Sequence, residues 1–271
     1  MDRVTLNLEE ALIAKGYSLE HSEILTSRFS GIERIYGVEG LLKLLDSHVM
    51  VIGVGGVGSW TVEALARSGI GKITLVDLDD VCVSNINRQL PALSNTIGRS
   101  KISVLADRML LINPLIKLHL VQDFYTSNSS EEILSRSVDY VVDAIDSLTN
   151  KALLVSTCIK KSIPVVTVGG AGGKVDPTCI RTCDLGETTV DPLLKQLRKR
   201  LRQTYGMSAS EKYGISAVFS PERPNLPAVC ATSKPKRLDC GTGYGSTSFV
   251  TGAFGFAAAS LVVTQLARQL N

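Results

Sequence analysis

Short apolar runs, rich in valine, isoleucine and leucine, recur along most of this chain. They cover residues 49–52, 72–76, 117–121, 139–142 and 163–168. Elsewhere, apolar side chains recur three and four positions apart in residues 38–45, 98–111, 149–161 and 192–205. The first pattern is typical of buried strands, and the second of helices with one apolar face. Because strands and helices alternate, we expect an α/β fold in which helices flank a mixed, mostly parallel sheet.

A glycine-rich turn follows the first apolar run and precedes a further helical pattern. Its glycines are Gly53, Gly55, Gly56 and Gly58. Without Cβ atoms the backbone can turn sharply, and its N–H groups can meet phosphate oxygens at the positive end of the helix. Asp77 ends the next strand about 20 residues further on, where its carboxylate can accept hydrogen bonds from ribose hydroxyls. The pattern predicts a nucleotide site, although nicotinamide and flavin enzymes share it and some glycine turns bind nothing.

A loop rich in hydrogen-bond donors is predicted between residues 78 and 101. It holds Asp79, Asp80, Asn85, Asn87, Arg88, Gln89 and Lys101. An extended triphosphate needs cations at several points, whereas backbone N–H groups largely suffice for the pyrophosphate of a dinucleotide. The loop therefore favours a nucleoside triphosphate, and no strand-end histidine or Tyr–Lys pair indicates hydride transfer.

Two aspartates stand where the run at residues 139–142 meets the next helix. Carboxylates at the carboxyl ends of parallel strands are well placed to bind ligands. Asp146 is the candidate ligand for Mg²⁺, while Asp143 is either a second ligand-binding group or a helix N-cap. A second glycine cluster, residues 169–173, either lets the backbone approach a substrate or forms a turn without a ligand.

Composition narrows the class of protein only modestly. The 271 residues carry a formal net charge of +3, which neither requires nor excludes nucleic acid, and 44% are hydrophobic. None of the six cysteines belongs to a C-x-x-C pair, so we expect no structural zinc. The first residues are charged and lack the apolar core of a signal peptide, which predicts a reducing, cytoplasmic setting.

An uncharged stretch at residues 249–267 is almost long enough to span a bilayer. Its glycines, serine, threonines and glutamine favour instead a helix buried in the domain or in a dimer interface. Peripheral membrane contact is the alternative.

Basic residues concentrate in the second half of the chain. In residues 192–205, leucines on one side of a predicted helix alternate with cations on the other, and more cations follow near residue 236. The candidates for contact with a nucleic-acid backbone are Lys195, Arg198, Lys199, Arg202, Lys236 and Arg237, although an ordinary solvated helix has the same pattern. Residues 208–227, rich in serine and proline, are predicted to form a loop.

Arg28 and Arg34 precede the glycine turn, each beside an aromatic residue. They are either solvated or reach the phosphates of a nucleotide in their own subunit or a partner subunit.

Several of these motifs, taken in order, resemble those of the ubiquitin-activating-enzyme-like (ThiF/MoeB-type) adenylyltransferases. They are GVGGVGS (53–59), VDLDDV (76–81), SNINRQ (84–89), GRSK (98–101) and DAID (143–146). The resemblance implies a Rossmann-like fold of the ubiquitin-activating-enzyme type. No clear linker divides the chain, so we expect one domain over residues 1–271, with a nucleotide-binding core at 49–173 and a substrate-side and dimer-interface portion at 174–271.

Further motifs are similar to one branch of that superfamily, the tRNA threonylcarbamoyladenosine dehydratases. They are RFSGIERIYG (28–37), DDVCVSNINRQ (79–89), VTVGGAGGKVDPT (166–178) and PKRLDCGTGYG (235–245). This resemblance implies that ATP adenylates the threonine carboxylate of threonylcarbamoyladenosine next to the tRNA anticodon, and that the base then cyclises with loss of water. It also implies a homodimer.

The resemblance implies a role for each matching residue. The four glycines would shape the ATP pocket, Asp77 and Asp79 would contribute to nucleotide binding, and Asp146 would hold Mg²⁺. The residues implied to engage the phosphates are Asn85, Arg88, Gln89 and Lys101, and those implied to be catalytic are Arg88, Lys101 and Asp146. Arg28 or Arg34 would reach into the neighbouring subunit's site.

Three alternatives stay open from the sequence. Adenylation of the C-terminus of a ubiquitin-like sulfur-carrier protein is disfavoured by the missing C-x-x-C pairs, although a sulfur-relay partner is conceivable. A scaffold that binds nucleotide without turnover is disfavoured by Lys101 and Asp146. Cys240, beside Lys236 and Arg237, is a candidate thiol for capturing an acyl adenylate, but adenylation and cyclisation complete the chemistry without it.

Overall fold

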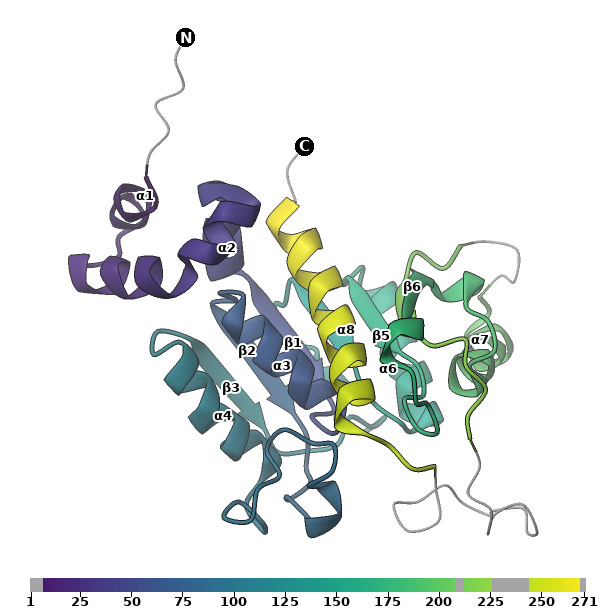
Figure 1. Ribbon diagram of the computed structural model, residues 1–271. Coiled ribbons are helices and arrows are strands. Elements are labelled where there is room, and N and C mark those ends of the chain that lie inside the picture. Colours follow the sequence, from purple (N-terminus) through teal and green to yellow (C-terminus); the bar gives the residue numbers. More distant parts are fainter. Residues whose placement is uncertain (1–6, 208–211, 226–243, 269–271) are drawn as a thin grey trace.

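A single seven-stranded sheet forms the centre of the computed structural model, which describes residues 7–207, 212–225 and 244–268 (Figure 1). In chain order the strands are β1 (His48–Ile52), β2 (Lys72–Val76), β3 (Lys117–Val121), β4 (Tyr140–Asp143), β5 (Val165–Val168), β6 (Arg181–Asp184) and β7 (Ser216–Phe219). Their order across the sheet is β3-β2-β1-β4-β5-β7-β6, and only the β6–β7 pair is antiparallel. The mixed, mostly parallel sheet predicted from the sequence is confirmed.

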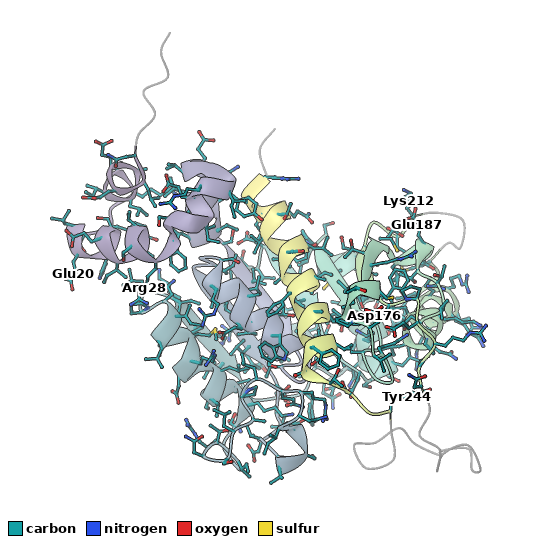
Figure 2. All side chains as sticks on the ribbon, viewed as in Figure 1. Glu20, Arg28, Asp176, Glu187, Lys212 and Tyr244 are labelled. Carbon is teal, nitrogen blue, oxygen red and sulfur yellow. The ribbon has the colours of Figure 1, made fainter. Side chains whose placement is uncertain are left out.

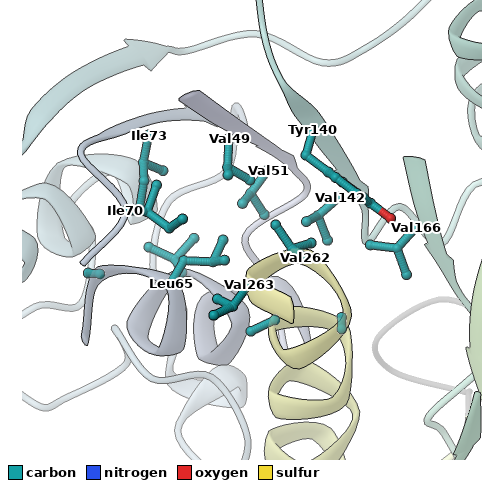
Figure 3. Packing of buried hydrophobic residues seen from close by; sticks show 14 of the residues in the cluster. Val49, Val51, Leu65, Ile70, Ile73, Tyr140, Val142, Val166, Val262 and Val263 are labelled. Carbon is teal, nitrogen blue, oxygen red and sulfur yellow. The ribbon is translucent and has the colours of Figure 1, made fainter. Parts of the chain in front are cut away.

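Helices cover both faces of this sheet. In chain order the helices of the described residues are α1 (Leu8–Ala14), α2 (Leu19–Asp46), α3 (Gly58–Arg67), α4 (Lys101–Ile112), α5 (Ser130–Ile133), α6 (Leu148–Lys160), α7 (Pro192–Tyr205) and α8 (Ser248–Arg268). Of these, α1 packs against α2 in a small cluster of its own. One apolar core joins α3, α4 and α8 to alternate strand residues such as Val49, Val51 and Ile73 (Figure 3). The other core joins α6 and α7 to the intervening residues, such as Met50 and Ile52. This alternation arises because successive side chains of a strand point to opposite faces.

The sequence pattern located β1 to β5 and the main helices within a few residues. The helix predicted over residues 98–111 begins only at Lys101, because Gly98 has a φ of +81° and its N–H donates to the Val81 carbonyl within the preceding loop. The N-terminal helical segment is longer than predicted: α2 runs over 28 residues with a break at Gly37, where φ is 75°.

The prediction of a loop over residues 208–227 is wrong for β7, which lies within that segment. Residues 208–211 and 226–227 lie outside the described part of the chain. The sequence analysis also missed β6, whose Arg-Thr-Cys-Asp sequence lacks an apolar run. Together β6 and β7 extend the sheet beyond β5, so the chain after residue 173 shares the sheet with the glycine-turn half.

The apolar C-terminal stretch forms α8, which packs against α3 and α2 (Figure 1). Close contact is possible because Gly255 faces α3, and the Thr61 hydroxyl donates to the Gly255 carbonyl at 3.2 Å. By length and composition α8 is the one helix in the described ranges that could cross a membrane, and 56% of its apolar window is buried inside the protein. The expected buried helix is therefore observed.

Replacing Gly255 with valine should destabilise the protein, because a Cβ atom there would lie 2.7 Å from the Val57 carbonyl oxygen and 2.9 Å from the Thr61 nitrogen. Overpacking of this kind costs about 1–3 kcal/mol. Ser260→Ala, an exposed position on the same helix, is the control and should change stability by less than about 0.5 kcal/mol. Urea unfolding of both variants measures the difference, and equal stabilities would contradict this account of the packing.

Candidate functional site

The strands β1 and β4 are neighbours, and their carboxyl ends lie side by side. Between them the order in which the chain adds strands to the sheet reverses. From β1 the chain passes through α3 to β2 on one side, whereas from β4 it passes through α6 to β5 on the other. The two helices therefore lie on opposite faces of the sheet. In open α/β sheets, ligands bind at such a switch point. The glycine turn after β1 and the Asp143–Asp146 segment after β4 both meet there.

At two of the four glycine positions, the protein's own backbone leaves no room for a side chain. Gly53 has a φ of +84°, and a Cβ atom there would lie 2.9 Å from the carbonyl oxygen of Ala144. At Gly58 a Cβ atom would lie only 1.9 Å from the Gly53 carbonyl oxygen. Gly55 is different, because a Cβ atom there would have as its nearest neighbour Gln89 Nε2, at 3.7 Å. Its open side is therefore available to a ligand.

Asp77 connects the glycine turn to the donor-rich loop. Its carboxylate accepts the Val54 N–H at 2.8 Å through Oδ2 and the Asp79 N–H at 2.9 Å through Oδ1. Burial raises the pKa of this carboxyl, and the two backbone N–H groups oppose that shift. Each oxygen retains a second lone pair, which can accept from a ribose hydroxyl.

The structure pairs two of the candidate site residues, Lys101 and Asp79, with each other. The Lys101 ammonium donates to Asp79 Oδ2 at 2.8 Å, and its side chain is only 5% exposed. Asp79 is 52% exposed, so the pair lies at the boundary between protein and solvent. Lys101 is also the first residue of α4, where the helix dipole adds positive potential. The two side-chain charges balance each other, so the helix N-terminus provides the positive potential at this end of the loop.

Two of the remaining loop residues lie beside the glycines: Gln89 near Gly55 and Arg88 near Gly56. Asn85 is buried and accepts the Cys82 N–H, while Arg88 donates to the Ser84 carbonyl at 2.8 Å. Gln89 is also buried, and its Oε1 has no hydrogen-bond partner within the described ranges. A buried amide oxygen without a partner is costly in the free protein. A ligand donor, such as a ribose hydroxyl or an adenine amino group, would relieve that cost.

Helices α3 and α8 hold this loop in place. The carbonyl oxygen of Arg88 accepts from the Trp60 indole at 3.0 Å and from the Thr251 hydroxyl at 3.2 Å. The Asn87 amide donates to the Ser246 carbonyl at 2.7 Å. The start of α8 thus lies against the loop after β2 (Figure 1).

The two aspartates after β4 have different environments. Asp143 is fully buried, pairs with the Lys151 ammonium at 2.8 Å and accepts from the Thr167 hydroxyl at 2.6 Å. Asp143 is neither a helix N-cap nor free to bind a ligand. Both roles predicted for it from the sequence are therefore wrong. Asp146 is exposed, and no ion pair involves it in the described part of the chain. Lys151, the buried partner of Asp143, was not among the site residues predicted from the sequence.

The two N-terminal arginines also differ. Arg28 donates to the carbonyls of Leu111 and Ile112, at the C-terminal end of α4 (Figure 2). This contact stabilises the helix dipole and keeps the guanidinium engaged within its own chain. Arg34 is exposed and makes no hydrogen bond or ion pair in the ranges that the structure describes. Of the two candidates, Arg34 is the one available to a second subunit.

On α7 the leucines pack and three of the four predicted cations, Lys195, Lys199 and Arg202, are exposed. The fourth, Arg198, is partly buried and donates to the Leu185 carbonyl at 3.3 Å and to the Thr188 hydroxyl. The structure therefore does not present Arg198 as a free surface cation. Lys236, Arg237 and Cys240 lie outside the described residues.

The second glycine cluster is filled by the protein's own groups. The Gly170 N–H donates to Asp191 Oδ2 at 3.0 Å, and the other carboxylate oxygen of Asp191 caps α7 at the Leu194 N–H. Tyr244 and Pro224 lie close to Gly173. The cluster thus joins β5 to α7 and to the segment before α8.

The chain is similar to known proteins over most of its length. The sequence model of the ThiF family matches residues 27–269. The tRNA threonylcarbamoyladenosine dehydratase of Haemophilus influenzae is 46% identical over 247 residues, which cover 89% of this chain and 94% of the relative.

Two crystal structures of the Escherichia coli tRNA N6-threonylcarbamoyladenosine dehydratase, TcdA, are similar to this chain. The complex with ATP has a TM-score of 0.82 at 42% identity and covers 90% of this chain and 97% of that chain. The complex with AMP has a TM-score of 0.81 at 43% identity and covers 89% and 94%.

Replacing Lys151 with methionine should cost about 3–5 kcal/mol of stability, because it leaves the buried Asp143 carboxylate without its partner. Lys161→Met, which removes an exposed pair with Glu131, should cost no more than about 1 kcal/mol. Chemical unfolding of the two variants compares them directly. Equal losses would show that the Asp143–Lys151 pair contributes no more than a surface pair.

The described cysteines should differ in their reaction with iodoacetamide. Burial raises the pKa of the Cys158 thiol to about 12, with the negative charge of Asp143 adding to the shift, so almost no reactive thiolate forms at neutral pH. Cys82 is exposed. Peptide mapping of the native protein should find Cys82 labelled long before Cys158, and equal labelling would contradict the buried placement of Cys158.

Proposed function

This chain belongs to the ThiF family, and we propose that it is an ATP-dependent tRNA threonylcarbamoyladenosine dehydratase. The enzyme adenylates the threonine carboxylate of threonylcarbamoyladenosine, next to the tRNA anticodon, and the modified base then cyclises. The observation that carries this conclusion is the meeting of the glycine turn with the loop after β2. Gln89 Nε2 lies 3.7 Å from the Cβ position of Gly55, and Arg88 Cγ lies 3.7 Å from that of Gly56.

The chemistry follows from the properties of a carboxylate. It is a poor electrophile, because it is anionic and has no adequate leaving group. One carboxylate oxygen attacks the α-phosphorus of ATP, pyrophosphate leaves, and a mixed anhydride with AMP results. The urea group of the same residue then attacks the activated carbonyl carbon, and AMP leaves with the attacking oxygen. Because both reacting groups belong to one molecule, ring closure benefits from a high effective concentration.

Each residue of this site would have its own role in the adenylation. The N–H groups around Gly55 and Gly56 face the phosphates, and Asp77 accepts from the ribose. Lys101 and Arg88 supply positive charge where pyrophosphate charge develops. In the free protein Asp79 balances the charge of Lys101, and a phosphate oxygen can share or replace that contact.

The exposed Asp146 carboxylate fits a Mg²⁺ ion that arrives with ATP. Within the described ranges no group of three or more histidine, cysteine or acidic side chains could hold a metal. Mg²⁺ suits such a site, because it keeps several waters and binds through one or two carboxylates plus substrate phosphates. When bound, the ion neutralises phosphate charge. Asp146 would hold it beside the glycine turn.

The proposal also assigns roles to the two portions of the chain and to a second copy of it. Residues 49–173 would bind the nucleotide, while residues 174–271 would serve the tRNA and a dimer interface. The exposed side chains of Lys195, Lys199 and Arg202 would contact the tRNA backbone. Arg34 would reach the phosphates in a second copy of the chain. A cytoplasmic location follows from a tRNA substrate, and a sulfur-relay partner and peripheral membrane contact remain predictions.

Adenylation of a sulfur-carrier protein is not favoured. The chain contains no C-x-x-C pair, and the Haemophilus influenzae relative matched over most of its length is a tRNA threonylcarbamoyladenosine dehydratase.

The function can be tested by mass spectrometry of nucleosides from threonylcarbamoylated tRNA after incubation with the protein and Mg²⁺-ATP. The modified adenosine should lose one water while AMP forms. Lys101→Ala and Asp146→Asn should each lower the rate at least about 100-fold, as expected for removal of a group that stabilises developing charge. An unchanged nucleoside with intact ATP binding would contradict the proposal.

Glycine substitutions should separate ligand binding from folding. Gly55→Ala should fold with near wild-type stability, because the nearest atom to its new methyl group would be 3.7 Å away, but it should bind ATP at least about tenfold more weakly. Gly58→Ala should lose about 3 kcal/mol of stability or more. Thermal unfolding and ATP titration compare the two. Normal ATP affinity in a folded Gly55→Ala variant would place the nucleotide elsewhere.

A further inference from the structure

A hollow of about 400 Å³ opens at the amino-terminal edge of the sheet, opposite the glycine turn. We call it the amino-edge pocket. It lies between the first residues of β2 and β3, the end of α2 and the turn after α1. Its polar lining consists of Lys15, Tyr17, Asp46, Lys72, Asn113 and Lys117. The ATP chemistry proposed above uses none of these residues.

Two lysines of the pocket stand directly beside each other. Lys72 and Lys117 are register partners at the first positions of the parallel strands β2 and β3, and both are exposed. Neither forms an ion pair within the ranges that the structure describes. Like charges at facing positions of neighbouring strands repel each other. An anion between the two ammonium groups would remove that repulsion.

The surrounding charges leave the pocket positive. Lys15 and Asp46 form an ion pair and balance each other. The net charge of the pocket wall is therefore set by Lys72 and Lys117.

The other walls of the pocket carry aromatic, apolar and amide groups, which could contact a ligand larger than a single ion. Tyr17 contributes an aromatic ring, Leu25, Leu45 and Leu115 contribute apolar surface, and Asn113 contributes an amide. The volume falls within the usual range of ligand pockets, roughly 300–1,000 Å³. Cations on one wall with aromatic and apolar groups on another match one nucleotide unit, whose phosphate is anionic and whose base and sugar are less polar.

We propose that the amino-edge pocket binds a backbone phosphate of the substrate tRNA, held between Lys72 and Lys117. The inference rests on the proposed function for the identity of the RNA. Each strand between this pocket and the catalytic edge has five residues, a span of about 17 Å. A tRNA is several times longer than that, so one molecule can contact both edges.

The test compares tRNA binding by the whole chain with and without these charges, over a range of salt concentrations. The variant is Lys72→Ala/Lys117→Ala. The control is Lys212→Ala, which removes an exposed lysine paired with Glu187 on the opposite side of the molecule (Figure 2). Each phosphate contact contributes about 0.7–0.9 to the slope of log affinity against log salt. The double variant should therefore bind about five- to tenfold more weakly at about 0.1 M salt, with a shallower slope, whereas the control should match wild type.

A second measurement needs no variant and so does not depend on folding. Amine-specific labelling of the wild-type protein, read by peptide mass spectrometry, should show that tRNA protects Lys72 and Lys117 but not Lys212. Inorganic phosphate serves as the second ligand, because it shares the chemistry of the backbone phosphate. Protection by inorganic phosphate without any effect of the double variant on tRNA affinity would overturn the RNA assignment.

The kinetic result separates this inference from the proposed function. The double variant should raise the KM for tRNA about five- to tenfold, with the loss falling on KM rather than kcat. Identical salt slopes for variant and wild type would overturn the inference even if dehydration is observed. Absence of dehydration by the wild-type protein, with the salt-slope difference present, would overturn the proposed function alone.

Discussion

The close approach of the turn after β1 to the segment after β4 is the constraint on which the site depends. The Gly53 backbone lies against the Ala144 carbonyl, and the Ala144 N–H donates to the last residue of β1, Ile52, at 3.0 Å. A side chain at Gly53 or Gly58 would push these segments apart. Their contact brings the N-terminus of α3 close to the segment that carries Asp146, so that the proposed phosphate and metal contacts would belong to one site.

The polar groups around this site have two roles, which depend on how deeply each group is buried. Asp143, Lys151 and Thr167 satisfy one another in the interior, where an unpaired charge would be strongly destabilising. Asp146 is exposed, and Asp79, the partner of the buried Lys101, is 52% exposed, so solvent or a ligand can reach both carboxylates. The buried network thus fixes the backbone that carries Asp146, and the accessible groups remain free to exchange partners when ATP binds.

The sequence predicted most of the nucleotide half, because its signals are local. The glycine spacing, the aspartate ending β2 and the apolar face of α4 each lie within a few turns of chain. What it missed depends on contacts between distant residues. Nothing near Arg28 indicates that it would bind the carbonyls at the end of α4, and nothing near Lys151 indicates a buried partner at Asp143. The four-residue strands β6 and β7 form by pairing with each other and with β5, which no local pattern encodes.

The account's central claim is that the threonine carboxylate is activated by bonding to the α-phosphorus of ATP. Transfer of isotopic oxygen tests this most directly, because the carboxylate oxygen that attacks phosphorus must leave with AMP. We would prepare threonylcarbamoylated tRNA with ¹⁸O in its carboxylate, incubate it with the protein and Mg²⁺-ATP, and measure the mass of the AMP. The account predicts one ¹⁸O atom in each AMP formed. Unlabelled AMP alongside cyclised base, or ADP as the product, would contradict it.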